Sequence, residues 1–161
     1  MNITFLGTGT SQGVPIIACK CSVCSSKNQK DKRLRSSILI QYNDINIVID
    51  TGPDFRQQML SSAITSCEAI LFTHAHRDHL AGLDDIRAFN FIMQKPIDIY
   101  CETPVDKAIR REFFYAFETI KYPGVPEMDI HIIEENPFEL FGKTIVPVSY
   151  THLTLPTNRE V

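Results

Sequence analysis

Three histidines and an aspartate fall within six residues of one stretch, T-H-A-H-R-D-H over residues 73–79. The apolar run over residues 69–72 comes directly before it and predicts a short buried strand. Alternate side chains of a strand, or of its extended continuation, share a face, so we expect His74 and His76 to point the same way. Two imidazoles on one edge can supply half of a tetrahedral zinc site.

Asp78 and His79 follow where Leu80 and Leu83 indicate the start of a helix, so we expect them to face a second position beside the first. A carboxylate with imidazoles suits zinc, iron or manganese, and the residue types leave that choice open. A single histidine is usually an ordinary surface or core residue. Because three of the five histidines lie in this one stretch, a metal site is the better interpretation.

A second group of metal-binding residue types is the C-x-C-x-x-C cluster of Cys19, Cys21 and Cys24. Three thiolates this close can occupy three corners of a tetrahedron, with a fourth ligand from elsewhere in the chain. Three free thiols in a loop are the alternative, and a redox pair lacks the strand–helix context that such pairs have. An odd total of five cysteines fits a reducing compartment better than a disulfide framework, so we expect a cytoplasmic protein.

The elements that must position these residues follow from turn residues and hydrophobic periodicity. Asp50 ends one expected strand, where it could orient a metal-bound histidine or simply begin a turn. The glycine-rich loop over residues 7–13 is one residue too long for a dinucleotide-binding fingerprint, and we interpret it as a tight turn at the rim of the site. Strands are expected over residues 3–6, 36–42, 45–50, 69–72, 97–101, 129–133, 138–140 and 143–148, and helices over 53–62, 79–90 and 104–117.

Composition limits the classes of function. With 161 residues, 43% hydrophobic and 22% charged, the chain has the size and balance of one globular domain. The net charge of −3 disfavours a broad nucleic-acid-binding surface but allows a small phosphate-bearing substrate. No apolar stretch is long enough to span a bilayer, and the N-terminus lacks a signal-peptide pattern, so we expect no membrane partner. His131 is expected to be a structural strand residue.

Taken together, these segments resemble a known family. The stretch from Phe5 to Pro15, F-L-G-T-G-T-S-Q-G-V-P, precedes the cysteine cluster, I-V-I-D-T-G-P over residues 47–53 and then H-x-H-x-D-H. This series closely resembles the PhnP-like cyclic phosphodiesterases, which are metallo-β-lactamase-fold hydrolases. The resemblance covers Asn2 to Val148. It implies an α/β fold of the metallo-β-lactamase type, an αββα sandwich built from two similar halves.

The resemblance also implies ligand roles. His74 and His76 would bind one metal, Asp78 and His79 a second, and Asp50 would be the supporting carboxylate behind them. The cysteine triad would hold a separate structural zinc, completed by a histidine near the family's C-terminus. The implied cofactors are therefore two divalent metals, zinc or manganese, and one structural zinc.

Only the N-terminal half to two-thirds of that sandwich is expected here, because the family's later ligands find no counterpart and no aspartate follows Asp129. We expect an incomplete domain over residues 1–148 and a non-native-looking tail over 149–161. That tail, S-Y-T-H-L-T-L-P-T-N-R-E-V, resembles one that recurs on unrelated predicted proteins. His152 lies near the register of the family's next metal histidine, so it is a candidate ligand of the first metal, unless its place in the tail is a coincidence.

The function implied by the resemblance is metal-dependent hydrolysis of a small phosphodiester, cyclic ones included. In an intact relative, two metals about 3.5–4 Å apart would share a hydroxide that attacks phosphorus or a carbonyl carbon, with Asp78 and His79 as the catalytic residues. This chain alone could be inactive. The alternatives are a transfer-RNA 3′-processing nuclease, a pyrroloquinoline-quinone accessory protein, a glyoxalase-type thioester hydrolase and a non-catalytic metal-binding fragment. The expected partner is the small substrate rather than nucleic acid, and a homodimer is an assembly to test.

Overall fold

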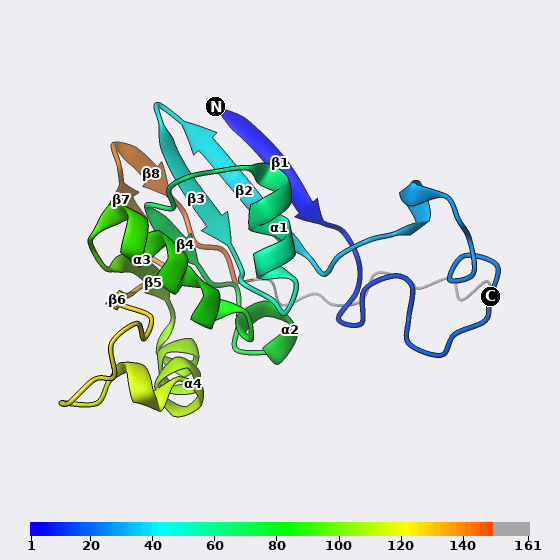
Figure 1. The fold of residues 1–161 in the computed structure, drawn as a ribbon. Helices are drawn as coiled ribbons and strands as arrows, with labels where there is room; N and C mark the ends of the chain where they lie inside the picture. Colours follow the sequence, from blue (N-terminus) through cyan, green and yellow to red (C-terminus); the bar gives the residue numbers. More distant parts are fainter. Residues whose placement is uncertain (150–161) are drawn as a thin grey trace.

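A six-stranded sheet in the order β1-β2-β3-β4-β5-β6 is the centre of the computed structural model, which describes residues 1–149 (Figure 1). Strands β1 to β3 pair antiparallel, and β3 to β6 pair parallel. The strands of this sheet are β1 (Asn2–Gly7), β2 (Ser37–Tyr42), β3 (Ile45–Ile49), β4 (Ala69–Leu71), β5 (Ile97–Cys101) and β6 (Met128–Ile132).

The β2–β3 hairpin closes where the sequence predicts, at Asn43 and Asp44. Both residues have positive φ, 47° and 62°. Two consecutive left-handed residues form the tight turn whose twist matches that of the flanking strands, and asparagine and aspartate tolerate that conformation. The turn fixes the register, in which Leu39 pairs with Val48.

One face of the sheet carries the helices and the main hydrophobic core. A row of apolar side chains crosses this face, with one residue from each of five neighbouring strands, and each is paired in register with the one on the next strand. The row consists of Leu39, Val48, Ile70, Ile99 and Ile130. The helices packed on this row are α1 (Phe55–Ser62), α2 (Arg77–Leu80), η2 (Leu83–Ile86), α3 (Arg87–Met93) and α4 (Thr103–Glu112), followed by η3 (Phe114–Ala116).

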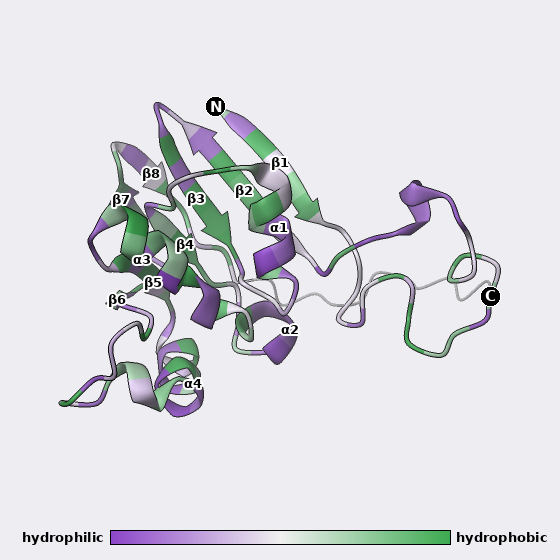
Figure 2. Ribbon diagram, viewed as in Figure 1, coloured by the Kyte–Doolittle hydropathy of each residue, from purple (hydrophilic) through white to green (hydrophobic). Residues whose placement is uncertain are grey.

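The opposite face carries a second, two-stranded sheet, β7 (Phe138–Leu140) paired with β8 (Lys143–Ile145). Leu140 packs there with Tyr42, Ile47 and Ala69. The layers are therefore helices, a six-stranded sheet and a two-stranded sheet, which agrees with the predicted α/β class. The strand β1 is coloured as hydrophobic over part of its length in Figure 2. Its Ile3 and Phe5 are 54% and 68% exposed.

A single helix over residues 79–90 was expected, and this prediction is wrong. The segment is broken into α2, η2 and α3, with Gly82 between the first two. A Cβ atom on Gly82 would overlap the carbonyl oxygen of Gly52. The chain therefore turns here so that two backbone segments can touch, and this close approach interrupts the helix.

Residues 14–34, which we call the cysteine arm, project away from the sheet (Figure 1). Val14 and Arg33 exchange two backbone hydrogen bonds of 2.8 Å at the base of the arm. The arm contains one short turn of 3-10 helix, η1 (Gln29–Asp31), and none of its residues is buried. Among the residues that the structure describes, no helix has the length and apolar character needed to cross a membrane.

Candidate metal centre

The histidine stretch lies at the carboxyl ends of two neighbouring parallel strands. Asp50 directly follows β3, and Thr73 to His79 follow β4. The backbone N–H of Asp50 donates to the carbonyl of Leu71 at 3.0 Å, which ties the two strand ends together. Parallel strands place the residues after their carboxyl ends at one edge of the sheet, so residues 23 or more positions apart meet here.

His74 and His76 extend from the same edge, as alternation predicts. Nε2 of His74 lies 3.1 Å from Nδ1 of His76, and their ring centroids are 4.6 Å apart. Two nitrogens bound to one tetrahedral zinc at about 2.0–2.1 Å would be about 3.3 Å apart. The observed separation therefore fits one edge of such a coordination sphere.

Asp78 and His79 form a second pair beside the first, on α2. Oδ2 of Asp78 lies 3.2 Å from Nε2 of His79, and the His79 ring centroid is 4.1 Å from that of His74. Within residues 1–149, the three cysteines are the one set of three or more such ligands whose ligand atoms all lie within 4.8 Å of one another. The histidines and Asp78 therefore form two pairs, and each pair needs further ligands to enclose an ion.

A buried carboxylate supports both pairs. Asp50 is 4% exposed, accepts the Thr73 N–H at 2.9 Å through Oδ1 and lies 2.7 Å from Nδ1 of His79 through Oδ2. With Nδ1 of His79 engaged by a carboxylate, its Nε2 is the nitrogen left for a metal. The φ of Asp50 is 61°, a left-handed conformation that is uncommon outside glycine. This backbone conformation directs the Asp50 side chain toward the histidines.

The surroundings of His74 disfavour its protonated form. Burial lowers the pKa of His74 below its ordinary value, and the neighbouring His79 and His76 lower it further. Desolvation and like charges both disfavour the protonated ring. Because a neutral imidazole is the form that binds a metal, this environment favours coordination by His74.

Backbone packing behind the pairs depends on glycine. A Cβ atom on Gly52 would overlap the carbonyl oxygen of Asp78, so the loop after β3 presses directly on α2. The N–H of Thr51 donates to the carbonyl of His79 at 2.7 Å, and the N–H of Gly82 donates to the carbonyl of Thr51 at 2.8 Å. The loop after β3 thus holds the second ligand pair from behind.

The three cysteines of the arm come together in the structure. Their sulfur atoms lie within 4.8 Å of one another, and the Cys24 N–H is 3.4 Å from the Cys21 sulfur. Three thiolates at Zn–S distances of about 2.3 Å would be about 3.8 Å apart, which the arm can accommodate. The Cys24 N–H lowers the pKa of Cys21 to about 7, with contributions from the thiols of Cys19 and Cys24.

The remaining histidines have different places. Nε2 of His131 is 2.6 Å from an Asp98 oxygen, and its ring stacks on Tyr100 with centroids 4.7 Å apart. These contacts tie β6 to β5 and agree with a structural role. His152 and the rest of the tail over 150–161 lie outside the described residues. The glycine-rich loop packs on residues 33–35, where a Cβ on Gly7 or Gly9 would meet backbone oxygens.

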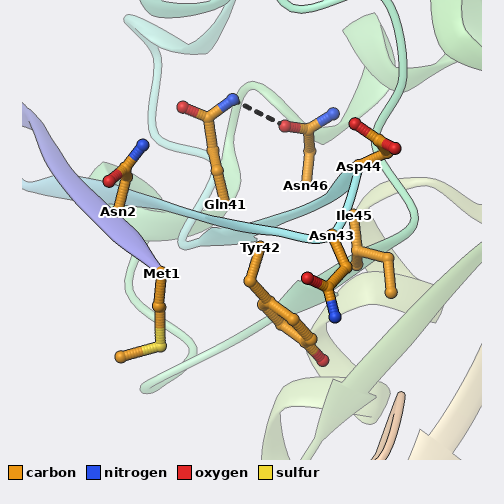
Figure 3. Close-up of a pocket in the computed structure, with 8 residues that line it drawn as sticks. All are labelled: Met1, Asn2, Gln41, Tyr42, Asn43, Asp44, Ile45 and Asn46. Atoms are coloured by element: carbon orange, nitrogen blue, oxygen red, sulfur yellow. Dashed lines mark hydrogen bonds between the residues drawn. The ribbon is translucent and has the colours of Figure 1, made fainter.

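One cavity of the described residues lies away from these ligands. It has a volume of about 290 Å³ and surrounds the β2–β3 turn, at the end of β3 away from Asp50 (Figure 3). Four of its eight lining residues carry carboxamides, and Nε2 of Gln41 donates to Asn46 at 2.8 Å. It contains none of the predicted metal ligands, so we place the candidate site at the strand ends, where the titratable groups converge.

Thr73 is a site residue that the sequence reasoning missed. Its hydroxyl lies 2.7 Å from Oδ2 of Asp50 and 2.9 Å from Nδ1 of His74. The signal was present, because a hydroxyl residue stands between the strand and the first histidine. Threonine is not a usual metal ligand, and its contact with Asp50 appears only once β3 and β4 pair.

The sheet is covered by helices on one side and by a second sheet on the other, and a histidine–aspartate cluster lies at its strand ends. Residues 45–160 match the β-lactamase superfamily domain. The chain belongs to this superfamily.

The chain is also similar to individual proteins. A Porphyromonas gingivalis protein named octanoyltransferase is 40% identical over 158 residues, covering 97% of this chain but 32% of that protein. A crystal structure described as a new diphosphatase from the PhnP family has a TM-score of 0.82 and 38% identity, covering 91% of this chain and 55% of the other. The chain thus spans about a third of the first relative and about half of the second.

Zn²⁺-bound PqqB from Methylobacterium extorquens (TM-score 0.66, 23% identity, covering 86% of this chain and 48% of the other) shares the fold. So does the short form of human tRNase Z (TM-score 0.58, 21% identity, covering 82% and 45%). At these identities the similarity establishes the fold alone.

Proposed function

We propose that the protein is a divalent-metal-dependent hydrolase of a small phosphate ester, with zinc or manganese at the strand ends. His74 and His76 hold one ion, and Asp78 and His79 hold the second. The observation that carries this proposal is the pair of ligand separations, 3.1 Å and 3.2 Å, formed side by side over one buried carboxylate. The similarity to a PhnP-family diphosphatase supports phosphate chemistry.

When bound, divalent ions supply a water acidic enough to lose its proton near neutral pH and positive charge beside the phosphoryl oxygens. The residues of the chain hold the ligand atoms in position. Asp78 and His79 present their ligand atoms from one turn of helix, and Asp50 holds His79 in the orientation that points Nε2 outward. Burial and the neighbouring histidines lower the pKa of His74, which favours the neutral ring that a metal binds.

A structural zinc at Cys19, Cys21 and Cys24 is the second part of the proposal. No residue of the arm is buried, so the arm has no core of its own to hold its shape. A metal bound by the three thiolates would hold the arm in a fixed shape in place of a core. The unbridged cysteines of the described chain are compatible with a reducing compartment, and we propose the cytoplasm.

The proposed substrates are a narrower class than the fold alone would indicate. A phosphodiester or a diphosphate ester fits the relative with 38% identity, and the net charge of −3 disfavours a large nucleic acid. One relative is named octanoyltransferase, but about two-thirds of that protein lies outside the match. Nothing in the metal centre favours octanoyl transfer. A pyrroloquinoline-quinone accessory role has some sequence support, because a Methylobacterium nodulans protein named coenzyme PQQ synthesis protein B is 30% identical over 101 residues, 54% of this chain and 34% of that protein. Transfer-RNA processing rests on shared fold alone.

The test is turnover of bis(p-nitrophenyl) phosphate by the 161-residue chain loaded with zinc or manganese, alongside a nucleoside diphosphate ester and an octanoyl thioester. We expect metal-dependent release of nitrophenol that disappears in His76→Ala and persists in His131→Ala, the matched histidine outside the site. Hydrolysis that is unaffected by His76→Ala or by a chelator would contradict the proposal. Metal bound at the histidines without turnover of any ester would favour a non-catalytic metal-binding role.

A further inference from the structure

The hydroxyl of Thr73 lies between a buried carboxylate and a metal-ligand imidazole. Its oxygen is 2.7 Å from Oδ2 of Asp50 and 2.9 Å from Nδ1 of His74. The same Oδ2 is 2.7 Å from Nδ1 of His79. One carboxylate oxygen is therefore connected to one histidine of each ligand pair, directly to His79 and through Thr73 to His74.

The directions of these hydrogen bonds follow from the number of available protons. An ionised carboxylate can only accept, so the single hydroxyl proton of Thr73 goes to Asp50. The Thr73 oxygen is then left as an acceptor, and Nδ1 of His74 must carry the proton that it accepts. Nε2 of His74 is thereby left with its lone pair, and this is the nitrogen that lies 3.1 Å from Nδ1 of His76.

The carboxylate at the centre of this network is held firmly. Its backbone N–H donates to Leu71 at 3.0 Å, and the Ser37 hydroxyl lies 2.9 Å from its carbonyl oxygen. The Thr73 N–H donates to Oδ1 at 2.9 Å, so Thr73 contacts both carboxylate oxygens. Such fixed contacts keep the Thr73 hydroxyl aimed, because neither Asp50 nor the backbone of residue 73 is free to turn.

We propose that Thr73 is a positioning residue whose hydroxyl connects Asp50 to His74, so that one buried carboxylate sets the ring tautomer of one histidine in each ligand pair. The inference deepens the proposed function, because it concerns the same ligands. A purely structural role would make Thr73 a β-branched residue at the end of a strand, and valine would then replace it without consequence for His74.

The decisive readout is the protonation of the His74 ring nitrogens in the metal-free chain, measured by two-dimensional ¹H–¹⁵N correlation above pH 7.5 and assigned with His74→Gln. In the wild type and in Thr73→Ser we expect a protonated Nδ1 and an unprotonated Nε2. In Thr73→Val, and in Thr73→Ala if valine prevents folding, we expect this preference to be lost. An unchanged His74 tautomer without the hydroxyl would overturn the proposal.

Zinc affinity gives an independent readout, measured by competition with a chelator in a background of Cys19→Ser, Cys21→Ser and Cys24→Ser. Loss of an outer hydrogen bond to a metal-bound histidine lowers affinity by about 10–100-fold, which we expect for Thr73→Val but not for Thr73→Ser. The control is Thr144→Val on β8, where the hydroxyl contacts Glu139 instead. Equal affinities for Thr73→Val and the wild type, or equal losses in Thr73→Ser and Thr73→Val, would also overturn it.

The two readouts separate this inference from the proposed function. The ring measurement needs neither metal nor turnover. If the wild-type chain hydrolyses no phosphate ester, the proposed function fails, and the tautomer of His74 still decides whether Thr73 positions it.

Discussion

The two candidate metal sites differ in what holds them. The histidine pairs stand on strand ends, over a carboxylate that is 4% exposed and beside a core that includes Leu80 and Leu83, both fully buried. The cysteine arm has no buried residue and is closed at its base by the hydrogen bonds between Val14 and Arg33. The protein fold can therefore position the first site in advance, whereas the second site depends on its metal for its shape.

The largest effect should come from the core that supports the histidine site. Ile70 is fully buried in β4, three residues before Thr73, and Ile17 in the arm is 94% exposed. Ile70→Ala should lower the free energy of unfolding by about 2–5 kcal/mol because it leaves a cavity, and Ile17→Ala should change it by less than about 0.5 kcal/mol. Urea unfolding followed by circular dichroism measures both, and equal losses would remove the contrast between the two regions.

A methyl group behind the second ligand pair should act more specifically. Gly52→Ala places a Cβ against the carbonyl oxygen of Asp78, so α2 must shift. We expect a loss of about 1–3 kcal/mol in the free energy of unfolding and weaker metal binding at the histidines, with the cysteine-bound zinc retained. Metal analysis after dialysis distinguishes the sites, and unchanged metal at the histidines would show that the loop after β3 does not position them.

Removing metal should loosen the arm and leave the sheet intact. The arm contains Lys20, Lys27, Lys30, Lys32 and Arg33, all exposed trypsin sites. After chelation we expect cleavage in the arm to accelerate by about tenfold or more, while near-native circular dichroism persists, because segments with few buried contacts open most easily. Mass spectrometry locates the cuts. Equal cleavage rates with and without zinc would mean that the arm is ordered without metal.

The thiols should show the same contrast in their chemistry. In the metal-free chain the pKa of Cys21 is lowered to about 7, whereas burial raises the pKa of Cys67 and of Cys101 to about 12. Since the thiolate is the reactive form, iodoacetamide labelling of Cys21 should rise steeply from pH 6 to pH 8 and then level off. Cys67 and Cys101 should stay unlabelled over this range. Labelling of Cys21 that keeps increasing to pH 9 or above would contradict the lowered pKa.

The sequence predicted most of the framework because its signals are local. Apolar alternation located every strand of the main sheet within two residues at each end, and Asn43 and Asp44 marked the hairpin. The broken helix after the motif was missed because its cause is a contact between Gly82 and the carbonyl of Gly52, thirty residues earlier in the chain. The role of Thr73 was missed for a similar reason, since it appears only when Asp50 is brought beside it by pairing of β3 with β4.

The most direct test of two separate sites is metal content by mass spectrometry in the wild type, His76→Ala and Cys21→Ser, each purified in parallel. His76→Ala should lose metal from the strand ends and keep the zinc of the arm, and Cys21→Ser should lose the arm's zinc and keep the other. If both variants lost the same single metal, the assignment of two independent centres would be contradicted.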